Sequence, residues 1–181
     1  VAQLRSGKVD RAGLAKLLTE NHQSFVSYVL ALSEADFTKS ESGKWTAGQQ
    51  LDHLYRSAKP LVLAFSLPPF IVKLLFGKAN RPSKTYEEIV QKYEGTLANG
   101  AKASGSFVPK TITFEQRTSL VNSLQKVVQK ITSKVANYNE QLLDEVVLPH
   151  PLLGKMTARE MLYFTIYHVS LHQKITQRNL S

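Results

Sequence analysis

Three of the five histidines in this 181-residue sequence, His53, His168 and His172, have the residue type and spacing that a metal site requires. His168 and His172 are four residues apart, so on a helix both rings project from one face and can reach a single ion. That spacing alone is a weak signal, because pairs of this kind also arise by chance. The case for a site depends on the neighbours of the pair and on a third histidine.

The neighbours of His168 and His172 are apolar, among them Phe164 and Val169, which predicts a buried helix. A buried imidazole costs free energy unless something satisfies its nitrogens. His53 lies between leucines in an earlier predicted helix and is the expected third ligand. Three imidazoles from two helices would form a neutral, open-faced site for Zn²⁺, Ni²⁺ or Fe²⁺. The alternative is three hydrogen-bonded histidines at a helix interface without an ion.

The composition limits the other chemistries that are open to the chain. It contains no cysteine, which excludes disulfides, thiolate zinc sites and cysteine nucleophiles and leaves histidine and carboxylate as metal ligands. With 43% hydrophobic and 20% charged residues, it is expected to form one globular domain over residues 1–181. The first ten residues lack the apolar core of a signal peptide, so the expected location is the cytoplasm.

Neither a membrane nor a nucleic acid is an expected partner. The longest apolar run, residues 61–76, is interrupted by polar residues and prolines and is shorter than the roughly 20 residues that span a bilayer. Its apolar part, residues 67–76, is expected to pack as a wall or lid of the pocket. The net charge is +9, but Lys126, Lys130 and Lys134 lack interleaved aromatic residues for base stacking and indicate a solvated helix face.

Four long segments have helical periodicity, at about residues 10–33, from Thr46, at about 114–146 and at about 157–178. The second and fourth open with capping boxes, in which Thr46 is followed by Gln49 and Thr157 by Glu160. The connection over residues 68–113 contains a predicted short helix at 86–97. We therefore predict an all-α four-helix bundle with a long crossover between helices 2 and 3, and no sheet.

Four other polar residues have weaker claims to a functional role. His22 lies in the apolar stripe of the first predicted helix and is expected to be a hydrogen-bonded core residue. His150 lies in a proline-rich turn and is expected to be structural. Gln49 and Gln173 lie near the predicted ligands in the sequence and could support the rings, although most such glutamines are surface residues.

Two stretches of the sequence carry a family resemblance. They are Gly43-Lys-Trp-Thr-Ala-Gly-Gln-Gln-Leu-Asp-His53-Leu, and His150-Pro-Leu-Leu-Gly-Lys-Met-Thr-Ala-Arg-Glu-Met-Leu followed by His168-x-x-x-His172-Gln-Lys-Ile. Together they resemble the DinB/YfiT-like superfamily. The resemblance implies an up-down-down-up four-helix bundle, with a divalent ion held by His53, His168 and His172. The family includes S-transferases for low-molecular-weight thiols, thiol-dependent isomerases and members without metal.

Two classes of function follow from these observations. The first is a divalent-metal-dependent enzyme acting on a small molecule, in which the ion lowers the pKa of a water or of a cosubstrate thiol. Hydrolysis and thiol transfer are both open. The second is a non-catalytic bundle that binds a metal or a small ligand, as a stress-linked or interaction protein. The sequence also leaves open whether the protein is a homodimer.

Overall fold

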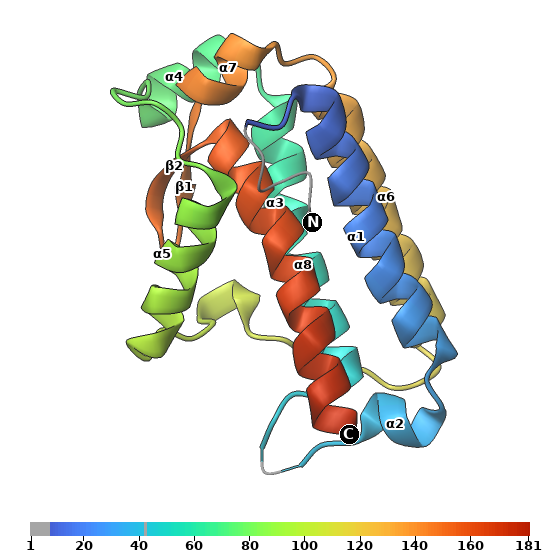
Figure 1. Cartoon of the computed structure of the whole chain (residues 1–181). Coiled ribbons are helices and arrows are strands. Elements are labelled where there is room, and N and C mark those ends of the chain that lie inside the picture. Colours follow the sequence, from blue (N-terminus) through green and yellow to red (C-terminus); the bar gives the residue numbers. More distant parts are fainter. Residues whose placement is uncertain (1–7, 42) are drawn as a thin grey trace.

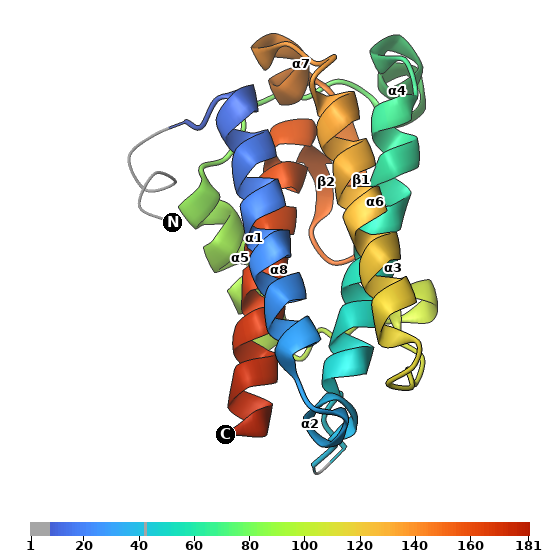
Figure 2. The same cartoon turned by 90° about the vertical axis from the view of Figure 1, so that its right-hand side faces the viewer.

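The computed structural model describes residues 8–41 and 43–181, and four long helices run side by side along it (Figure 1). In Figures 1 and 2, α1 and α8 run in one direction and α3 and α6 in the other. The second and third bundle helices are therefore parallel, which requires the long crossover between them. The predicted all-α, four-helix fold is confirmed. The bounds of the bundle helices are Arg11–Ala31 for α1, Ala47–Ser66 for α3, Arg117–Val135 for α6 and Ala158–Leu180 for α8.

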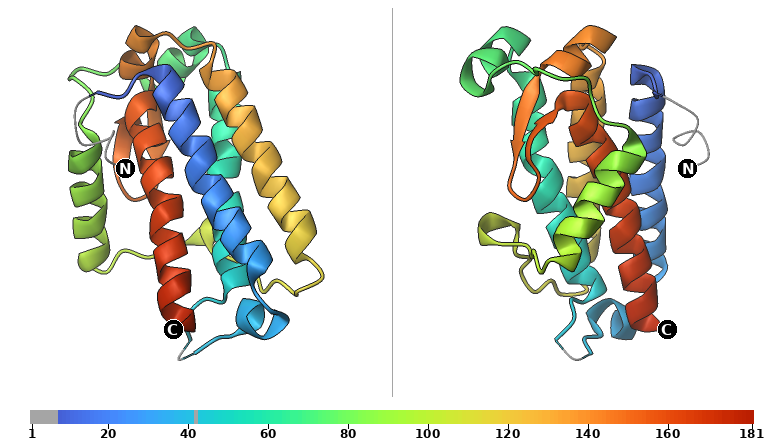
Figure 3. Two further views of the ribbon diagram at one scale, coloured as in Figure 1. Left: turned by 45° about the vertical axis from the view of Figure 1, so that its right-hand side comes forward. Right: turned by 60° about the vertical axis from the view of Figure 1, so that its left-hand side comes forward.

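Each bundle helix packs against two others and contributes apolar side chains to a shared core. α1 and α3 each contact both α6 and α8. Residues 158–166 of α8 are all buried, because α5, Tyr86–Ala98, and a β-hairpin cover the side of α8 that faces away from the bundle (Figure 3). This enclosure explains why the apolar residues of α8 surround the helix instead of forming one stripe.

Capping boxes fix the start of both helices that carry the candidate ligands. At α3, the Thr46 hydroxyl accepts a hydrogen bond from the Gln49 amide (3.1 Å), and the Gln49 side chain accepts one from the Thr46 amide (3.0 Å). Thr157 and Glu160 make the same pair of bonds at α8 (3.2 and 2.9 Å). Because these bonds satisfy amides that no helical partner reaches, both helices begin where predicted.

The connections contain short elements that periodicity cannot reveal. The crossover holds α4, Pro69–Phe76, the predicted α5, and a 3₁₀ turn, η2, at Gly105–Phe107. A further short helix, α2, covers Glu34–Thr38 at the opposite end of the molecule from α4 (Figure 1). Neither α2 nor α4 was predicted, because five and eight residues span too few turns to show an apolar stripe.

The predicted third helix, at about residues 114–146, is wrong in extent. α6 ends at Val135, and a separate helix, α7, covers Glu140–Glu145. Asn139 separates the two, because its side chain accepts a hydrogen bond from the Leu142 amide and caps the start of α7. Asparagine competes with helical hydrogen bonds in this way, whereas the apolar spacing continues across the break.

The expectation of no sheet is also wrong. Between α7 and α8, strands β1, Val147–His150, and β2, Gly154–Thr157, form an antiparallel hairpin. In its register His150 is opposite Gly154, which has a φ of 73° and closes the turn in a conformation that favours glycine. Strands of four residues are too short to show an alternating pattern in the sequence.

No single helix among residues 8–41 and 43–181 is long and apolar enough to cross a membrane. Taken together, α3 and α4 reach the required length and composition, but they are bent by 112° where they meet.

Candidate metal centre

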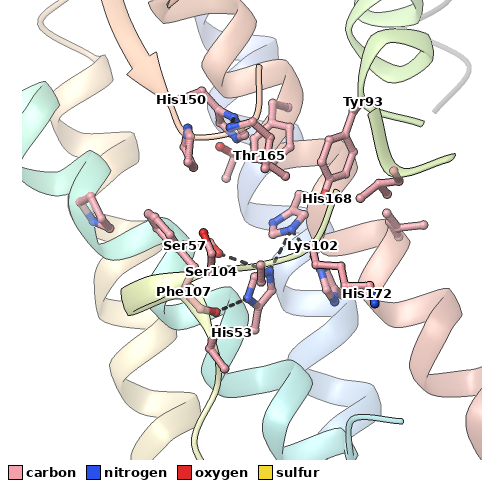
Figure 4. Close-up of a pocket in the computed structure, with 18 of the residues that line it drawn as sticks. His53, Ser57, Tyr93, Lys102, Ser104, Phe107, His150, Thr165, His168 and His172 are labelled. Carbon is pink, nitrogen blue, oxygen red and sulfur yellow. Dashed lines mark hydrogen bonds between the residues drawn. The ribbon is translucent and has the colours of Figure 1, made fainter. Parts of the chain in front are cut away.

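The structure brings His53, His168 and His172 together between α3 and α8 (Figure 4). The Nε2 atom of His168 lies 3.2 Å from Nε2 of His53 and 2.9 Å from Nε2 of His172. All three side chains are buried, with exposed fractions of 4–6%. The predicted clustering of the three histidines is therefore present, and one nitrogen of each ring points to a common centre.

Hydrogen bonds on the far side of two of the rings decide which nitrogen carries the proton. The Nδ1–H of His53 donates to the backbone carbonyl of Phe107 in η2 (2.7 Å). The Nδ1–H of His172 donates to the side-chain carbonyl of Gln50 on α3. Because a neutral imidazole has one N–H, the Nε2 atoms of His53 and His172 carry lone pairs. A metal ligand needs a free lone pair at the atom that faces the ion.

The distances fit a single small cation. Imidazole nitrogens bound at about 2.0–2.1 Å around a tetrahedral Zn²⁺ are separated by about 3.3 Å from one another. The observed separations of 3.2 and 2.9 Å are close to that value. An acceptor on Nδ1 of a ligating histidine is also the arrangement that fixes the ring in metal sites.

Burial keeps the candidate ligands in the neutral form. Desolvation lowers the pKa of His168 and of His172 well below 6.5, and each ring would also be repelled by a charge on its neighbours. Desolvation lowers the pKa of His53 as well, although its hydrogen bond to Phe107 opposes this shift. Neutral imidazoles are the form that binds a cation, so the ligands need not lose a proton at neutral pH.

The three rings face a cavity of about 530 Å³ between α3, α5, η2, β1 and α8. The Trp45 ring lies 5.0 Å from the His53 ring and 6.4 Å from that of His172, in parallel with the latter. No aspartate or glutamate lines the cavity among the described residues. Besides the three histidines, its polar lining consists of Ser57, Tyr93, Lys102, Ser104, His150 and Thr165.

Three other polar residues, His22, Gln49 and Asp52, have structural roles. The Nδ1–H of His22 donates to the carbonyl of Leu18 (2.7 Å), which makes His22 a hydrogen-bonded core residue, as expected. Gln49 belongs to the cap of α3. Asp52 bonds to Arg56 and to the Lys110 amide, away from the His53 ring.

The expectation that residues 67–76 form a wall or lid of the pocket is wrong. No described residue of α4 lines the cavity, and α4 lies at the same end of the bundle as α7 (Figure 2), where Lys73 pairs with Glu145 (2.6 Å). Val72 anchors α4 in the core, while Phe70 and Leu74 are 71% and 84% exposed. The sequence of residues 67–76 shows that the segment is apolar, but it does not show which part of the protein the segment packs against.

Sequence reasoning missed three contributors to the site, Gln50, Phe107 and Trp45. Gln50 lies three residues before His53, so it shares the face of α3 that meets α8, and this spacing was a usable signal. In the sequence, Trp45 is recognisable as the apolar residue before the Thr46 cap, but its contact with the histidine rings is not. Nothing in the sequence indicates that the crossover returns the Phe107 carbonyl to His53.

Comparison with known proteins supports a family assignment and goes no further. No curated protein and no solved structure was found to match the chain. The sequence matches the profile of the DinB superfamily over residues 17–175, which includes all three clustered histidines and all four bundle helices except the ends of α1 and α8. Since that match spans most of the sequence, the chain belongs to the DinB superfamily.

Proposed function

We propose that this protein is a divalent-metal-dependent enzyme of transferase or hydrolase type, with His53, His168 and His172 as its metal ligands. The observation that carries the proposal is the convergence of the three Nε2 atoms, with separations of 3.2 and 2.9 Å, next to a cavity. A structural ion would be sealed by a fourth protein ligand, whereas a catalytic one needs an open position. Here no carboxylate of the described lining competes for that position.

The donor set suits activation of a nucleophile. Three neutral imidazoles leave the full charge of a divalent ion uncompensated, and such an ion supplies a Lewis acid that lowers the pKa of a water or thiol ligand. Burial raises the pKa of Tyr93 to about 12, so its hydroxyl remains protonated at neutral pH and can donate a hydrogen bond into the cavity. The Ser57 hydroxyl lies 3.5 Å from Nε2 of His53 and can hold a polar atom nearby.

The reaction we propose is attack by water or by a low-molecular-weight thiol on a small electrophile. The chain has no cysteine, so a thiol must come from a cosubstrate. Most of the cavity lining is apolar, which favours an electrophile with an apolar body. Membership of the DinB superfamily agrees with a metal site and leaves the choice between the two nucleophiles to experiment.

Elemental mass spectrometry on protein purified without a histidine tag tests the metal site. We expect one equivalent of Zn, Ni or Fe in the parent protein and none in a His168→Ala/His172→Ala variant. A His22→Gln variant, which loses a histidine outside the cluster, is the control and should retain the metal. Absence of metal from the parent after reconstitution would overturn the proposal. The same metal content in the double variant as in the parent would show that the metal binds at another site.

Activity assays on the metal-loaded protein then separate enzyme from binding protein. We would assay hydrolysis of 4-nitrophenyl butyrate, and transfer of glutathione or cysteine to 1-chloro-2,4-dinitrobenzene. We expect at least one reaction to require the metal and to be lost in the His168→Ala/His172→Ala variant. A stoichiometric metal whose coordination by X-ray absorption shows a fourth protein ligand, with neither reaction above the uncatalysed rate, would favour a non-catalytic metal-binding bundle.

A further inference from the structure

A fourth histidine, His150, lines the same cavity without belonging to the metal cluster (Figure 4). It ends β1, and its Nδ1 accepts hydrogen bonds from the backbone amides of Leu152 (3.2 Å) and Leu153 (3.1 Å) in the hairpin turn. Amide N–H groups only donate, so Nδ1 carries no proton. The proton of the neutral ring is therefore on Nε2.

The ring is held in this state and in this orientation. The ring makes a T-shaped contact with the Phe164 ring, with centroids 4.3 Å apart and an interplanar angle of 72°. Desolvation, with a smaller contribution from the nearby charge of Lys92, lowers the pKa of His150 to about 4. At neutral pH the side chain is then a fixed, uncharged hydrogen-bond donor.

The Nε2–H donor of His150 has no acceptor in the described part of the chain. Among residues 8–41 and 43–181, none accepts a hydrogen bond from Nε2 of His150, and this atom is not among the buried polar atoms without partners. The side chain is half-buried, so Nε2 is reachable from the cavity that the residue lines. A role in forming the turn accounts for the hydrogen bonds of Nδ1, but it gives no function to the N–H group at Nε2.

His150 and the metal cluster are close enough for one small molecule to touch both. Phe164 bridges them, because its ring stacks on His168 at 4.9 Å and also contacts the His150 ring. The rest of the wall is mostly apolar, and Lys102 is the one formally charged side chain among the described lining residues. The lining includes Trp45, Leu61, Leu97, Leu152, Met161 and Ile175.

We propose that His150 is a substrate-binding residue, whose Nε2–H donates a hydrogen bond to a carbonyl-type oxygen on a substrate with an apolar body. The bond would hold that oxygen at the β1 side of the cavity while the apolar body fills the space towards the clustered histidines. This assignment deepens the proposed function and rests on it for the identity of the ligand as a substrate. It selects carbonyl compounds and esters over hydrocarbons and over cationic molecules.

A pair of probe ligands and a pair of variants test the proposal. Propiophenone and propylbenzene share an aromatic body, but only propiophenone has a carbonyl. His150→Asn places an oxygen near the position of Nδ1, where it can still accept from the turn amides, and removes the donor at Nε2. His150→Gln keeps an N–H donor near the position of Nε2. Binding is followed by NMR titration of the indole N–H of Trp45, the only tryptophan of the chain.

We expect His150→Asn to weaken propiophenone binding about fivefold, the effect of one hydrogen bond, and to leave propylbenzene binding unchanged. His150→Gln should retain most of the affinity. Equal losses for both ligands would show that His150 contributes only shape. No loss for propiophenone, or no binding of it to the parent protein, would likewise overturn the proposal.

Nitrogen-15 NMR of the histidine rings provides a check that needs no variant. We expect His150 to have its proton on Nε2, and a proton on Nδ1 would overturn the assignment. All titrations are run on the full chain after Zn²⁺ loading and again after treatment with a chelator. If the chain takes up no zinc, the proposed enzymatic function fails, while the chelator-treated sample still decides whether His150 binds the carbonyl.

Discussion

The two acceptors behind His53 and His172 determine what the clustered rings can bind. The Phe107 carbonyl is part of the backbone, so no substitution removes it cleanly, but Gln50 is a side chain that can be changed. Its carbonyl holds the proton of His172 on Nδ1 and leaves Nε2 free. The affinity of the proposed metal site should therefore depend on a residue that is not itself a proposed ligand.

Replacing Gln50 with leucine is expected to lower Zn²⁺ affinity by 10- to 100-fold, the usual effect of losing a residue that orients a ligand. Competition with a chromophoric chelator measures this change. Gln173→Leu is the control, because Gln173 is next to His172 in the sequence and makes no hydrogen bond to the three rings among the described residues. Equal affinities of parent and Gln50→Leu would show that Gln50 does not orient the ring.

At the scale of single residues, the sequence predicted the members of the cluster better than their supports. The clustered histidines were recognisable because polar rings at helical spacing inside apolar segments need a partner. The roles of Phe107 and Gln50 depend on contacts between residues 54 and 122 positions apart in the sequence. The free Nε2 of His150 depends on a tight turn. Such contacts leave no local pattern.

The first turn of α8 positions two of the candidate ligands and starts directly after strand β2. Thr157 caps it, and the same hydroxyl lies 2.8 Å from the hydroxyl of Ser83 in the crossover. The cap thus joins the start of α8 to the segment before α5.

Thr157→Ala is expected to lower the free energy of unfolding by about 1–2 kcal/mol through loss of the cap. Urea denaturation measures this change. Thr19→Ala is the matched control, because Thr19 is exposed and its hydroxyl donates to the Ala15 carbonyl of its own helix. Its effect should stay within about 0.5 kcal/mol, and a comparable loss in both variants would argue against a special role for the cap.

The elements that the sequence predicted correctly are those with local chemistry at their boundaries. Thr46 and Thr157 give the start of α3 and α8 because a capping box is complete within four residues. The end of α6 was missed because Asn139 follows an apolar spacing that continues into α7. Short elements such as α4 are set by what they pack against, so the sequence shows only their composition.

For the molecule as a whole, Arg159 joins segments that are far apart in the sequence. Its side chain is 1% exposed, and the guanidinium donates to Asp144 (2.6 Å), to Glu140 (2.6 Å) and to the carbonyl of Val9 (2.6 Å). One side chain of α8 thereby fixes α7 and the segment that leads into α1.

Arg159→Met is expected to lower the free energy of unfolding by about 2–3 kcal/mol, because Asp144, Glu140 and the Val9 carbonyl lose a charged hydrogen-bond donor. Calorimetry or urea denaturation measures the loss. Lys16→Met provides the comparison, since the Lys16–Glu20 ion pair is exposed and 3.9 Å long and should contribute less than about 0.5 kcal/mol. Similar losses in the two variants would contradict the role given to Arg159.

The stability of the whole fold should fall in mild acid because of buried histidines. Burial lowers the pKa of His22 from 6.5 to about 4, so between these values the unfolded chain binds a proton that the folded chain excludes. The contribution of neutral His22 to the free energy of unfolding therefore has its full value above pH 6.5 and decreases as the pH falls towards 4. For His22 alone the loss at pH 4.5 is about 2–3 kcal/mol, at about 1.4 kcal/mol for each pKa unit.

Urea denaturation of metal-free protein at pH 7.5 and pH 4.5 tests this contribution. His22→Leu is expected to reduce the difference between the two pH values by about 2–3 kcal/mol, because leucine cannot take up a proton. The variant and the parent should show the same small change between pH 7.5 and pH 8.5. An unchanged acid dependence in His22→Leu would show that His22 titrates normally in the folded protein.

The position of α8 has a consequence for the order of events during synthesis. α8 contributes His168 and His172, packs against both α1 and α3, and is translated after every other described element. Until it emerges from the ribosome, the faces of α1 and α3 that it covers have no partner, and His53 is a lone imidazole. A nascent chain that lacks α8 would expose apolar surface and hold no ion tightly, so metal loading of the proposed site must follow folding of α8.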